Sequence, residues 1–408
     1  MRIRPASFAF TLLLGALGAL PSLSIDMGLP ALSHVARSLG TTSAGASLSL
    51  SVFMVGFALA PLVFGPLSDR HGRRPVLLAG CAIFTLAGVG CALAGSLPVL
   101  LGCRFVQGAG AGSGAVLVLA TIRDLFEGPV ARARQSYVSM VMSVAPMVAP
   151  TLGAWVLAVG HWRAIYGVLA LGGLVLLGVL ALGLPESAPA GRVPLTARGL
   201  GRAYARVLGH RLSFGYSLIN ALSFGACFAY ISGSPLVLME VLGVSPKLYG
   251  TCFALTSLAL MVGAFINGRL SARGVSGARL LTSGLALAGG CAVLLVGLTL
   301  TGLGSLATML PLFVLGNLGM ALISPNATHG ALQPMPDIAG VASAVLSGLR
   351  MLMAAGTSAL VAFLYDGRSA LAVTGVMTAF ALASALVYVT FVRPVESRAV
   401  PGPLPANA

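Results

Sequence analysis

The stretch at residues 65–74 reads GPLSDRHGRR and separates two long apolar runs. It holds four charged residues, whereas residues 46–64 and 76–99 hold none. A helix rises 1.5 Å per residue, so about twenty apolar residues cross the roughly 30 Å hydrocarbon core of a membrane. We therefore predict a membrane hairpin whose turn lies in residues 65–74, where two glycines and Pro66 permit a tight change of direction.

The composition excludes a soluble globular protein. Hydrophobic residues make up 57% of the 408 residues and charged residues only 8%, whereas soluble domains carry about 25% charged residues. The fold class is predicted to be all-α and polytopic, because the apolar runs lack the alternation of a β-barrel. The net charge of +15 comes from basic residues in short gaps between these runs. We therefore expect contact with the lipid bilayer and none with nucleic acid.

Counting the apolar runs gives twelve predicted membrane spans. They lie at residues 8–33, 46–67, 75–95, 98–122, 136–159, 164–184, 212–238, 248–270, 279–301, 305–331, 340–365 and 370–392. Alternating the gaps between them places eighteen basic residues on the side of Arg2 and four on the other. By the positive-inside rule, Arg2 and both termini are expected in the cytoplasm, with the protein in a bacterial inner membrane.

The longest gap between spans is rich in proline and glycine and is predicted to be a cytoplasmic linker at residues 185–211. It divides a six-helix bundle at 1–184 from a second one at 212–392, and a cytoplasmic tail follows at 393–408. Two motifs recur in these halves: GPLSDR at residue 65 returns as GRLSAR at 268, and FVQGAGAG at 105 returns as FVLGNLGM at 313. A parallel repeat of this kind is expected of a transporter that moves its halves around a central site.

Three ionisable residues fall inside predicted spans: Asp26, Arg104 and Arg350. A charge inside a membrane costs at least about 2.5 to 3.5 kcal/mol, so each is expected to have a partner or to face a water-filled cavity. Asp26 and Arg104 both lie roughly 9 Å from the outer ends of their spans and are predicted to pair. The pair is interpreted either as a proton and substrate site or as a static salt bridge. Arg350 has no acidic residue at matching depth and is a candidate substrate contact.

Other polar side chains in the spans are weaker candidates for binding. Gln107 follows Arg104 and is expected to point inward with it. A polar and aromatic stripe recurs at helical spacing in the seventh span: Tyr216, Asn220, Phe224 and Cys227. Such a stripe suits an amphipathic ligand, but it also joins helices inside a membrane.

Two spans carry residues that influence helix packing. The fourth has the run RFVQGAGAGSG from Arg104, whose glycines let a neighbouring helix approach closely. The fifth has VAPMVAPTLGAW, in which Pro146, Pro150 and Gly153 are expected to bend or loosen the helix. Packing alone also explains these three residues.

In order and position, GPLSDRHGRRP, RFVQGAGAG and APMVAPTLG resemble three signature motifs of the major facilitator superfamily, the third being associated with its drug/proton antiporters. The segments SIDMGLPAL, ATIRDLF, WRAIY and FAYISGSP resemble the bicyclomycin, chloramphenicol and sulfonamide resistance group (Bcr/CflA type). The resemblance extends from the first span to the twelfth. Two positions depart from the pattern: the third motif has alanine where glycine usually precedes proline, and Ala272 stands where the first copy of the loop has Asp69.

The resemblance implies a gating motif at the cytoplasmic side, formed by Gly65, Asp69, Arg70, Gly72 and Arg73. Asp69 would face the start of the eleventh span. By the same resemblance, Asp26 and Arg104 would form the proton and substrate site.

Together these observations predict a secondary transporter that exports amphipathic drugs in exchange for protons by alternating access. An enzyme is not expected, because the sequence lacks a nucleotide-binding loop, paired catalytic carboxylates and a His or Cys cluster. The proton gradient would supply the energy, so no cofactor or metal is expected, and a monomer is expected. One alternative is a metabolite exporter or an importer of the same fold, and another is a membrane enzyme or sensor.

Overall fold

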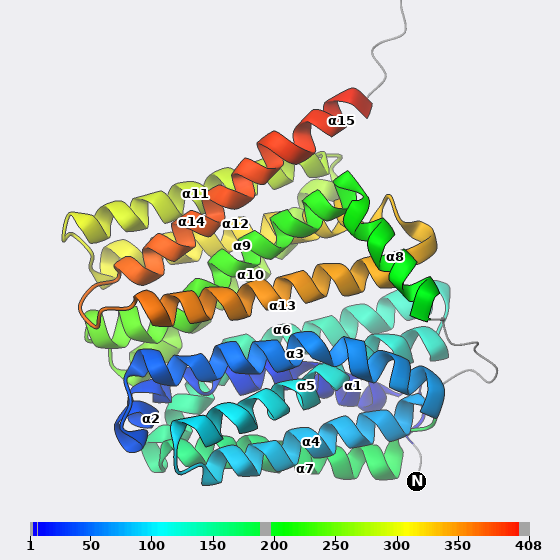
Figure 1. Ribbon diagram of the computed structural model, residues 1–408, viewed down its shortest axis with the longest axis horizontal. Helices are drawn as coiled ribbons and strands as arrows, with labels where there is room; N and C mark the ends of the chain where they lie inside the picture. Colours follow the sequence, from blue (N-terminus) through cyan, green and yellow to red (C-terminus); the bar gives the residue numbers. More distant parts are fainter. Residues whose placement is uncertain (1–2, 6, 188–196, 400–408) are drawn as a thin grey trace, which may run out of the picture. The chain divides into compact units, whose positions relative to one another are not determined.

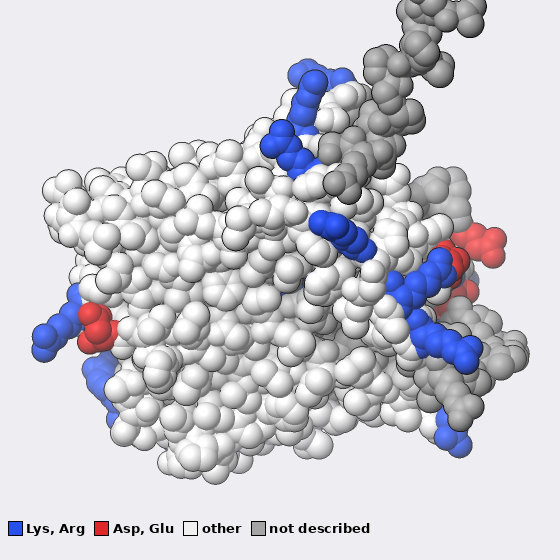
Figure 2. Space-filling model, turned by 45° about the horizontal axis from the view of Figure 1, so that its top comes forward, with Lys and Arg blue, Asp and Glu red and all other residues white. Residues whose placement is uncertain are grey.

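The computed structural model describes residues 3–5, 7–187 and 197–399, and it contains helices and no strands in these ranges. Within the described ranges, twelve helical segments are long and apolar enough to cross a membrane. This confirms the predicted all-α polytopic class and the predicted number of spans. On the face drawn in Figure 2, charged side chains gather near the helix ends, and the helix sides between them are uncharged. An uncharged surface of this kind suits the apolar core of a membrane.

The helices of the first six spans have the following bounds: α1 (Phe8–Asp26), η1 (Leu29–Ala31), α2 (Leu32–Leu39), α3 (Ser43–His71), α4 (Arg73–Leu93), α5 (Leu97–Leu125), α6 (Gly128–Val159) and α7 (Trp162–Gly183). The later helices are α8 (Ala197–Gly209), α9 (Arg211–Pro235), η2 (Leu236–Val241), α10 (Pro246–Ala272), α11 (Gly277–Leu300), α12 (Leu306–Leu332), η3 (Pro336–Ile338), α13 (Ala339–Leu364), α14 (Leu371–Val387), η4 (Tyr388–Val392) and α15 (Arg393–Ala399).

The turn of the first hairpin is shorter than the sequence suggests. Helix α3 continues through Gly65 and Pro66 to His71, and α4 begins at Arg73, so Gly72 alone makes the turn. Gly72 has φ +94°, a conformation that glycine adopts without steric penalty. The prediction that Gly65 and Pro66 form the turn is therefore wrong. A proline inside a membrane helix is tolerated when neighbouring groups compensate for the lost backbone hydrogen bond.

Contacts divide the described chain into two compact units. The first unit contains the described residues of Met1–Pro194 together with Phe228–Leu258 and Ala354–Val373. The second unit contains the described residues of Leu195–Cys227, Ala259–Met353 and Thr374–Ala408. Parts of α9, α10, α13 and α14 thus group with the first six spans, whereas the predicted division of the chain at 185–211 stays a prediction.

Within the first unit, neighbouring helices lie side by side: α3 with α5, α4 with α5 and α7, and α1 with α6. Figure 1 shows α4 running alongside α7 and α3 alongside α5. In the second unit, α11 packs along α12 so closely that a Cβ on Gly319 would lie 2.9 Å from the carbonyl oxygen of Gly284. Gly319 belongs to FVLGNLGM at residue 313, the second copy of the motif that begins at residue 105.

The predicted linker contains a helix that the sequence analysis did not identify. Helix α8 buries Val207 fully in a cluster with Met335 and Val345, and Arg206 forms an ion pair with Asp337. Both contacts lie within the second unit. Residues 188–196 of the linker, 400–408 of the tail and Arg2 lie outside the described residues.

Candidate functional site

Arg104 on α5 is the centre of a buried polar cluster in the first unit, and its side chain is only 1% exposed. Its Nη1 donates hydrogen bonds to Ser24 Oγ on α1 and to Gln107 Oε1 one turn along α5, both at 2.8 Å. Gln107 is itself fully buried. The prediction that Gln107 points inward with Arg104 is therefore confirmed.

Two aromatic rings flank the Arg104 guanidinium. Its central carbon lies 4.4 Å from the centroid of Phe53 and 5.6 Å from that of Tyr166. The faces of aromatic rings carry partial negative charge, so they stabilise a buried cation without a carboxylate. The Nε atom of Arg104 is buried and has no hydrogen-bond acceptor in the part of the chain that the structure describes.

Asp26, the last residue of α1, does not form the predicted ion pair with Arg104. Its side chain is 4% exposed, and among the described residues it has no hydrogen bond or ion-pair partner. Each residue of a helix is rotated by about 100° around the axis from the one before, so a residue two positions further is rotated by about 200°. Since Ser24 points toward Arg104, Asp26 points away from it. Both the pairing and its interpretation as a static salt bridge are therefore wrong for this structure.

Tyr249, in the first turn of α10, is a titratable residue within electrostatic range of Asp26. Tyr249 is fully buried, and its hydroxyl shares a hydrogen bond of 3.0 Å with Ser234. All three residues belong to the first unit. Tyr249 was missed from the sequence because its distance along the chain from Asp26 gives no signal of proximity.

Helix α6 packs against the end of α1 beside Asp26. A Cβ on Gly153 would lie 2.2 Å from the carbonyl oxygen of Met27, so only glycine fits at this contact. Helix α6 is continuous through Pro146 and Pro150. Packing therefore accounts for Gly153, whereas bending of the helix by the two prolines stays a prediction.

The glycines of α5 confirm the expected close packing of the fourth span. A Cβ on Gly108 would lie 2.1 Å from the carbonyl oxygen of Phe53 on α3, and one on Gly110 would lie 2.6 Å from the backbone nitrogen of Phe84 on α4. The glycine-rich run therefore holds two neighbouring helices directly against α5, next to Arg104.

The predicted gating motif gathers around Arg73 in the first unit. The Arg73 side chain is buried and forms ion pairs with Asp69 at 2.8 Å and with Asp124 at 2.9 Å. It also donates a hydrogen bond to Ser68. The side chain of Asp124 is 1% exposed and that of Asp69 is 43% exposed. Asp124 lies in ATIRDLF and was missed as a partner of the motif because only the spacing within residues 65–74 was considered.

The remaining residues of the motif have less specific surroundings. Arg70 is exposed, and a Cβ on Gly65 would meet no atom within 4 Å. Packing therefore does not explain Gly65. The expected position of Asp69 opposite the start of the eleventh span stays a prediction.

Glu186 caps the beginning of α4 beside the motif. Its carboxylate accepts hydrogen bonds from the backbone N–H groups of Arg73 at 2.8 Å and Arg74 at 3.2 Å. A Cβ on Gly72 would lie 2.5 Å from this carboxylate. The one-residue turn thus depends on glycine both for its φ angle and for the space that Glu186 occupies. No motif or periodicity connects Glu186 with Arg73, which lie 113 positions apart.

Arg350 and Phe224 form a contact in the second unit. The guanidinium carbon of Arg350 lies 4.1 Å from the centroid of the Phe224 ring. Both side chains are half-buried, and Nε of Arg350 has no hydrogen-bond acceptor in the described ranges. The structure thus brings together two candidate residues that the sequence analysis treated separately.

Two members of the predicted stripe join helices of the second unit. The Asn220 amide donates hydrogen bonds to Ser324 O at 3.0 Å and to Thr328 Oγ1 at 3.2 Å. The Tyr216 hydroxyl donates to the carboxylate of Glu396. These bonds agree with the interpretation of the stripe as a helix-joining element, and a role of Tyr216 or Asn220 in substrate binding stays a prediction.

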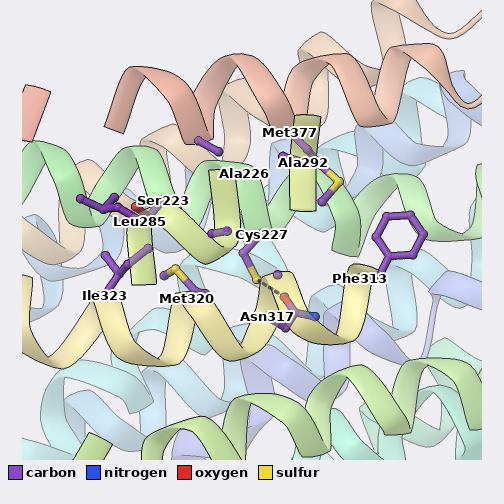
Figure 3. A pocket seen from close by; sticks show the side chains of 13 residues that line it. Ser223, Ala226, Cys227, Leu285, Ala292, Phe313, Asn317, Met320, Ile323 and Met377 are labelled. Carbon is purple, nitrogen blue, oxygen red and sulfur yellow. Dashed lines mark hydrogen bonds between the residues drawn. The ribbon is translucent and has the colours of Figure 1, made fainter. Parts of the chain in front are cut away.

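A small cavity lies among α9, α11, α12 and α14 in the second unit (Figure 3). Cys227 and Asn317 point toward each other there, and Cys227 Sγ donates a hydrogen bond to Asn317 Oδ1 at 3.4 Å. The cavity measures about 30 Å³. Drug-sized ligands need about 300–1,000 Å³, so this cavity is large enough for water but not for a drug.

Two known proteins with drug-resistance names are similar to this chain over most of its length. The chain is 33% identical over 344 residues to a "Chloramphenicol resistance protein" of Pseudomonas aeruginosa, covering 83% of this chain and 80% of the relative. It is 29% identical over 365 residues to a "Bicyclomycin resistance protein homolog" of Haemophilus influenzae, covering 89% and 91%. These relatives confirm the resemblance to the bicyclomycin and chloramphenicol resistance group.

A solved structure described as "Crystal structure of D-xylose-proton symporter" shares the fold. It has a TM-score of 0.74 and 16% sequence identity, and the match covers 95% of this chain and 98% of that chain. The family model described as Major Facilitator Superfamily matches residues 12–358. Given twelve spans, the three motifs and this match, the chain is a multi-pass membrane protein that belongs to the Major Facilitator Superfamily.

Proposed function

We propose that this protein exports small amphipathic molecules in exchange for protons. The observation that carries the proposal is Asp26, an acidic side chain buried in the first span without an ionic partner among the described residues. Acidic residues inside the membrane mark proton and substrate pathways in transporters. The names of the relatives, which concern chloramphenicol and bicyclomycin resistance, give the substrate class.

Asp26 is the proposed proton carrier. A carboxyl group takes up or releases a proton when its surroundings change between wet and dry, and alternating access makes such a change for a group in the transport path. Since Asp26 has no ion pair to break, proton transfer at this residue leaves the Arg104 cluster intact. Proton exchange and substrate release are then coupled through the conformational change.

Two clusters are proposed as substrate contacts, each within its own unit. Arg104 with its aromatic neighbours offers apolar ring faces and a guanidinium donor, and the Arg350–Phe224 contact offers the same chemistry. Chloramphenicol-like molecules combine an aromatic ring with polar groups. Each cluster thus offers both apolar surface and hydrogen-bond donors to such a molecule.

The proposed location, topology and energy source of the protein rest on its charge distribution and its family. The protein would lie in a bacterial inner membrane as a monomer with both termini in the cytoplasm. The proton gradient would supply the energy without a cofactor, and no enzymatic activity is proposed. A proton that crosses 100 mV releases about 2.3 kcal/mol. At about 1.4 kcal/mol per tenfold, this supports a substrate gradient somewhat below a hundredfold.

Transport by purified protein in liposomes tests the proposal. Radiolabelled chloramphenicol is followed while a pH gradient or a membrane potential is imposed, with and without ATP. We expect movement against the direction of proton flow, lost when both gradients are collapsed and unaffected by ATP. Movement in the same direction as protons would instead support the alternative of a proton-coupled importer. Movement that requires ATP contradicts proton antiport altogether.

A further inference from the structure

A second, larger hollow lies on the surface of the second unit, and the sequence analysis did not predict it. It runs between α11 and the segment formed by α14 and η4, and we call it the α11–α14 groove. Its volume is about 910 Å³, about thirty times that of the cavity beside Cys227. All of its lining residues belong to the second unit.

The two helices meet at one end of the groove and separate toward the other. Thr378 Oγ1 donates a hydrogen bond to the carbonyl oxygen of Ala292 at 2.8 Å, and the hydroxyls of Thr299 and Thr374 lie 3.3 Å apart. From there the groove extends toward Arg279 near the beginning of α11. It opens at the end of the helices where the arginine distribution places the cytoplasm.

The groove is apolar along its length and open at its floor. A Cβ on Gly289 or on Gly290 would meet no atom within 4 Å. Leu294 of α11 and Leu382 of α14 are exposed along its walls, at 58% and 49%. Among the residues that the structure describes, no acidic one lines the groove. Its walls therefore suit hydrocarbon chains rather than a polar solute.

The mouth of the groove carries two basic side chains, Arg279 and Arg393. Both are exposed, and neither forms an ion pair with any described residue. Glu396 is the nearby acidic residue, but it does not line the groove, and its carboxylate accepts a hydrogen bond from Tyr216. The mouth therefore presents unpaired positive charge, with Arg279 near the beginning of α11 and Arg393 just after η4.

We propose that the α11–α14 groove binds an anionic phospholipid. Its phosphate would contact Arg279 and Arg393, and its acyl chains would lie along the apolar walls over Gly289 and Gly290. The occupant is a lipid because an apolar groove within the span leads to a cationic mouth at its end. That order of apolar and charged groups matches one lipid molecule. The site is separate from the residues proposed for transport, so it stands whether or not drug export is confirmed.

Native mass spectrometry of the intact protein in detergent tests this site. The probe is phosphatidylglycerol, with phosphatidylcholine of the same chain length as the zwitterionic comparison of zero net charge. We expect one tightly bound phosphatidylglycerol on the wild type. The double variant Arg279→Gln/Arg393→Gln should weaken its binding about thirtyfold, the factor for two basic residues at an anionic surface.

A groove-filling variant and a charge control complete the design. Gly290→Leu adds a side chain into open space, so it should lower lipid occupancy without lowering the thermal stability of the lipid-free protein. Arg273→Gln removes an exposed arginine that does not line the groove and should leave binding unchanged. Equal binding of phosphatidylcholine, or an equal loss in Arg273→Gln, overturns the proposal. A change of oligomeric state in Gly290→Leu with unchanged lipid binding also overturns it, because a second copy would then be the occupant.

Discussion

Arg104 donates a hydrogen bond to Ser24 across the interface of α5 and α1, with 2.8 Å between Nη1 and Oγ. Asp26, two residues further along α1, lies outside this contact. The cation and the carboxyl group, which the sequence predicts at one depth in the membrane, therefore have separate surroundings in the first unit. A change of charge on Asp26 breaks no ion pair in the described part of the chain, so the proton exchange proposed for Asp26 would leave the hydrogen bonds of Arg104 in place.

The first prediction concerns Arg104 itself. Arg104→Lys keeps the charge but loses the planar guanidinium, whose Nη1 bonds both Ser24 and Gln107 while its central carbon lies over the Phe53 ring. We expect a loss of about 1–3 kcal/mol, the range for leaving a buried polar partner unsatisfied. The measurement is the Tm of the purified protein in detergent.

The matched control for this prediction lies on the same helix. Arg123 is exposed near the end of α5, so Arg123→Lys should change stability by no more than about 0.5 kcal/mol. Equal losses of Tm in the two variants would show that the hydrogen bonds of Arg104 do not account for its contribution to stability.

The second prediction compares the two carboxylates that pair with Arg73. Asp124 is 1% exposed, and breaking a buried ion pair costs up to about 3–5 kcal/mol. Asp69 is 43% exposed, and exposed pairs contribute about 0–1 kcal/mol. Asp124→Asn should therefore lower Tm clearly, although Asp69 still shares the charge of Arg73. Asp69→Asn should leave Tm nearly unchanged.

Transport distinguishes stability from gating in these variants. If Asp69 holds the cytoplasmic gate, Asp69→Asn should impair transport while membrane insertion stays normal. The accessibility of a cysteine probe on the outer side should change as the protein favours its inward-open state. Full transport together with unchanged labelling would reject a gating role for Asp69.

The number and approximate positions of the spans could be predicted because they depend on apolar length and on which gaps hold arginine. The role of glycines such as Gly110 was also predictable, since close helix packing requires small residues. The hydrogen-bond partner of Arg104 could not be predicted, because the depth of a residue along a span does not determine its direction around the helix axis. That direction separates Ser24 from Asp26.

Contacts between residues far apart in the chain also escaped prediction. Glu186 bonds the beginning of α4, and Tyr249 lies within electrostatic range of Asp26 at the end of α1. Neither contact has a periodic signal in the sequence. Helix α8 was missed for a different reason, since the proline and glycine content of residues 185–211 favoured a linker without regular structure. In each case the missing information was tertiary packing, which a single sequence does not contain.

The third prediction concerns the cap on α4. Glu186→Ala removes the acceptor for two backbone N–H groups and the negative charge at a helix N-terminus, so we expect a loss of about 1–2 kcal/mol. Glu186→Gln keeps an acceptor without the charge, so its Tm should lie between that of the wild type and that of Glu186→Ala. The measurement is Tm in detergent. Glu127→Gln is the control, because Glu127 is exposed and its side chain makes no capping bond to α6. A loss as large in Glu127→Gln would contradict the capping role.

The fourth prediction tests close packing with two glycines of one helix. Gly110→Ala would place a Cβ 2.6 Å from the backbone nitrogen of Phe84, a distance that forces α4 and α5 apart. Gly102→Ala adds the same methyl group where no atom lies within 4 Å. We expect Gly110→Ala to reduce the yield of folded protein sharply. Gly102→Ala should gain up to about 1 kcal/mol from helix propensity. Size-exclusion profiles of the two variants after detergent extraction provide the measurement.

The last prediction concerns Asp26. Asp26→Asn replaces a carboxyl group with an amide of the same size that cannot exchange a proton. Because Asp26 has no bonding partner among the described residues, the variant should fold with a Tm at or above that of the wild type. Efflux of chloramphenicol driven by a pH gradient should fall to the level of empty liposomes, while binding of the drug to the detergent-solubilised protein should persist. Asp26→Glu retains a carboxyl group and should keep part of the activity.

Proton release separates a direct role of Asp26 from a structural one. When drug is added to lightly buffered wild-type protein in detergent, the conformational change that couples drug binding to Asp26 should release protons, and Asp26→Asn should release none. The Arg123→Lys variant serves as a comparison, since Arg123 is exposed on α5 and lies outside the proposed substrate contacts, so it should still release protons. If Asp26→Asn releases as many protons as the wild type and pumps normally, Asp26 is structural. His329 on α12 would then be the next residue to test as the proton carrier.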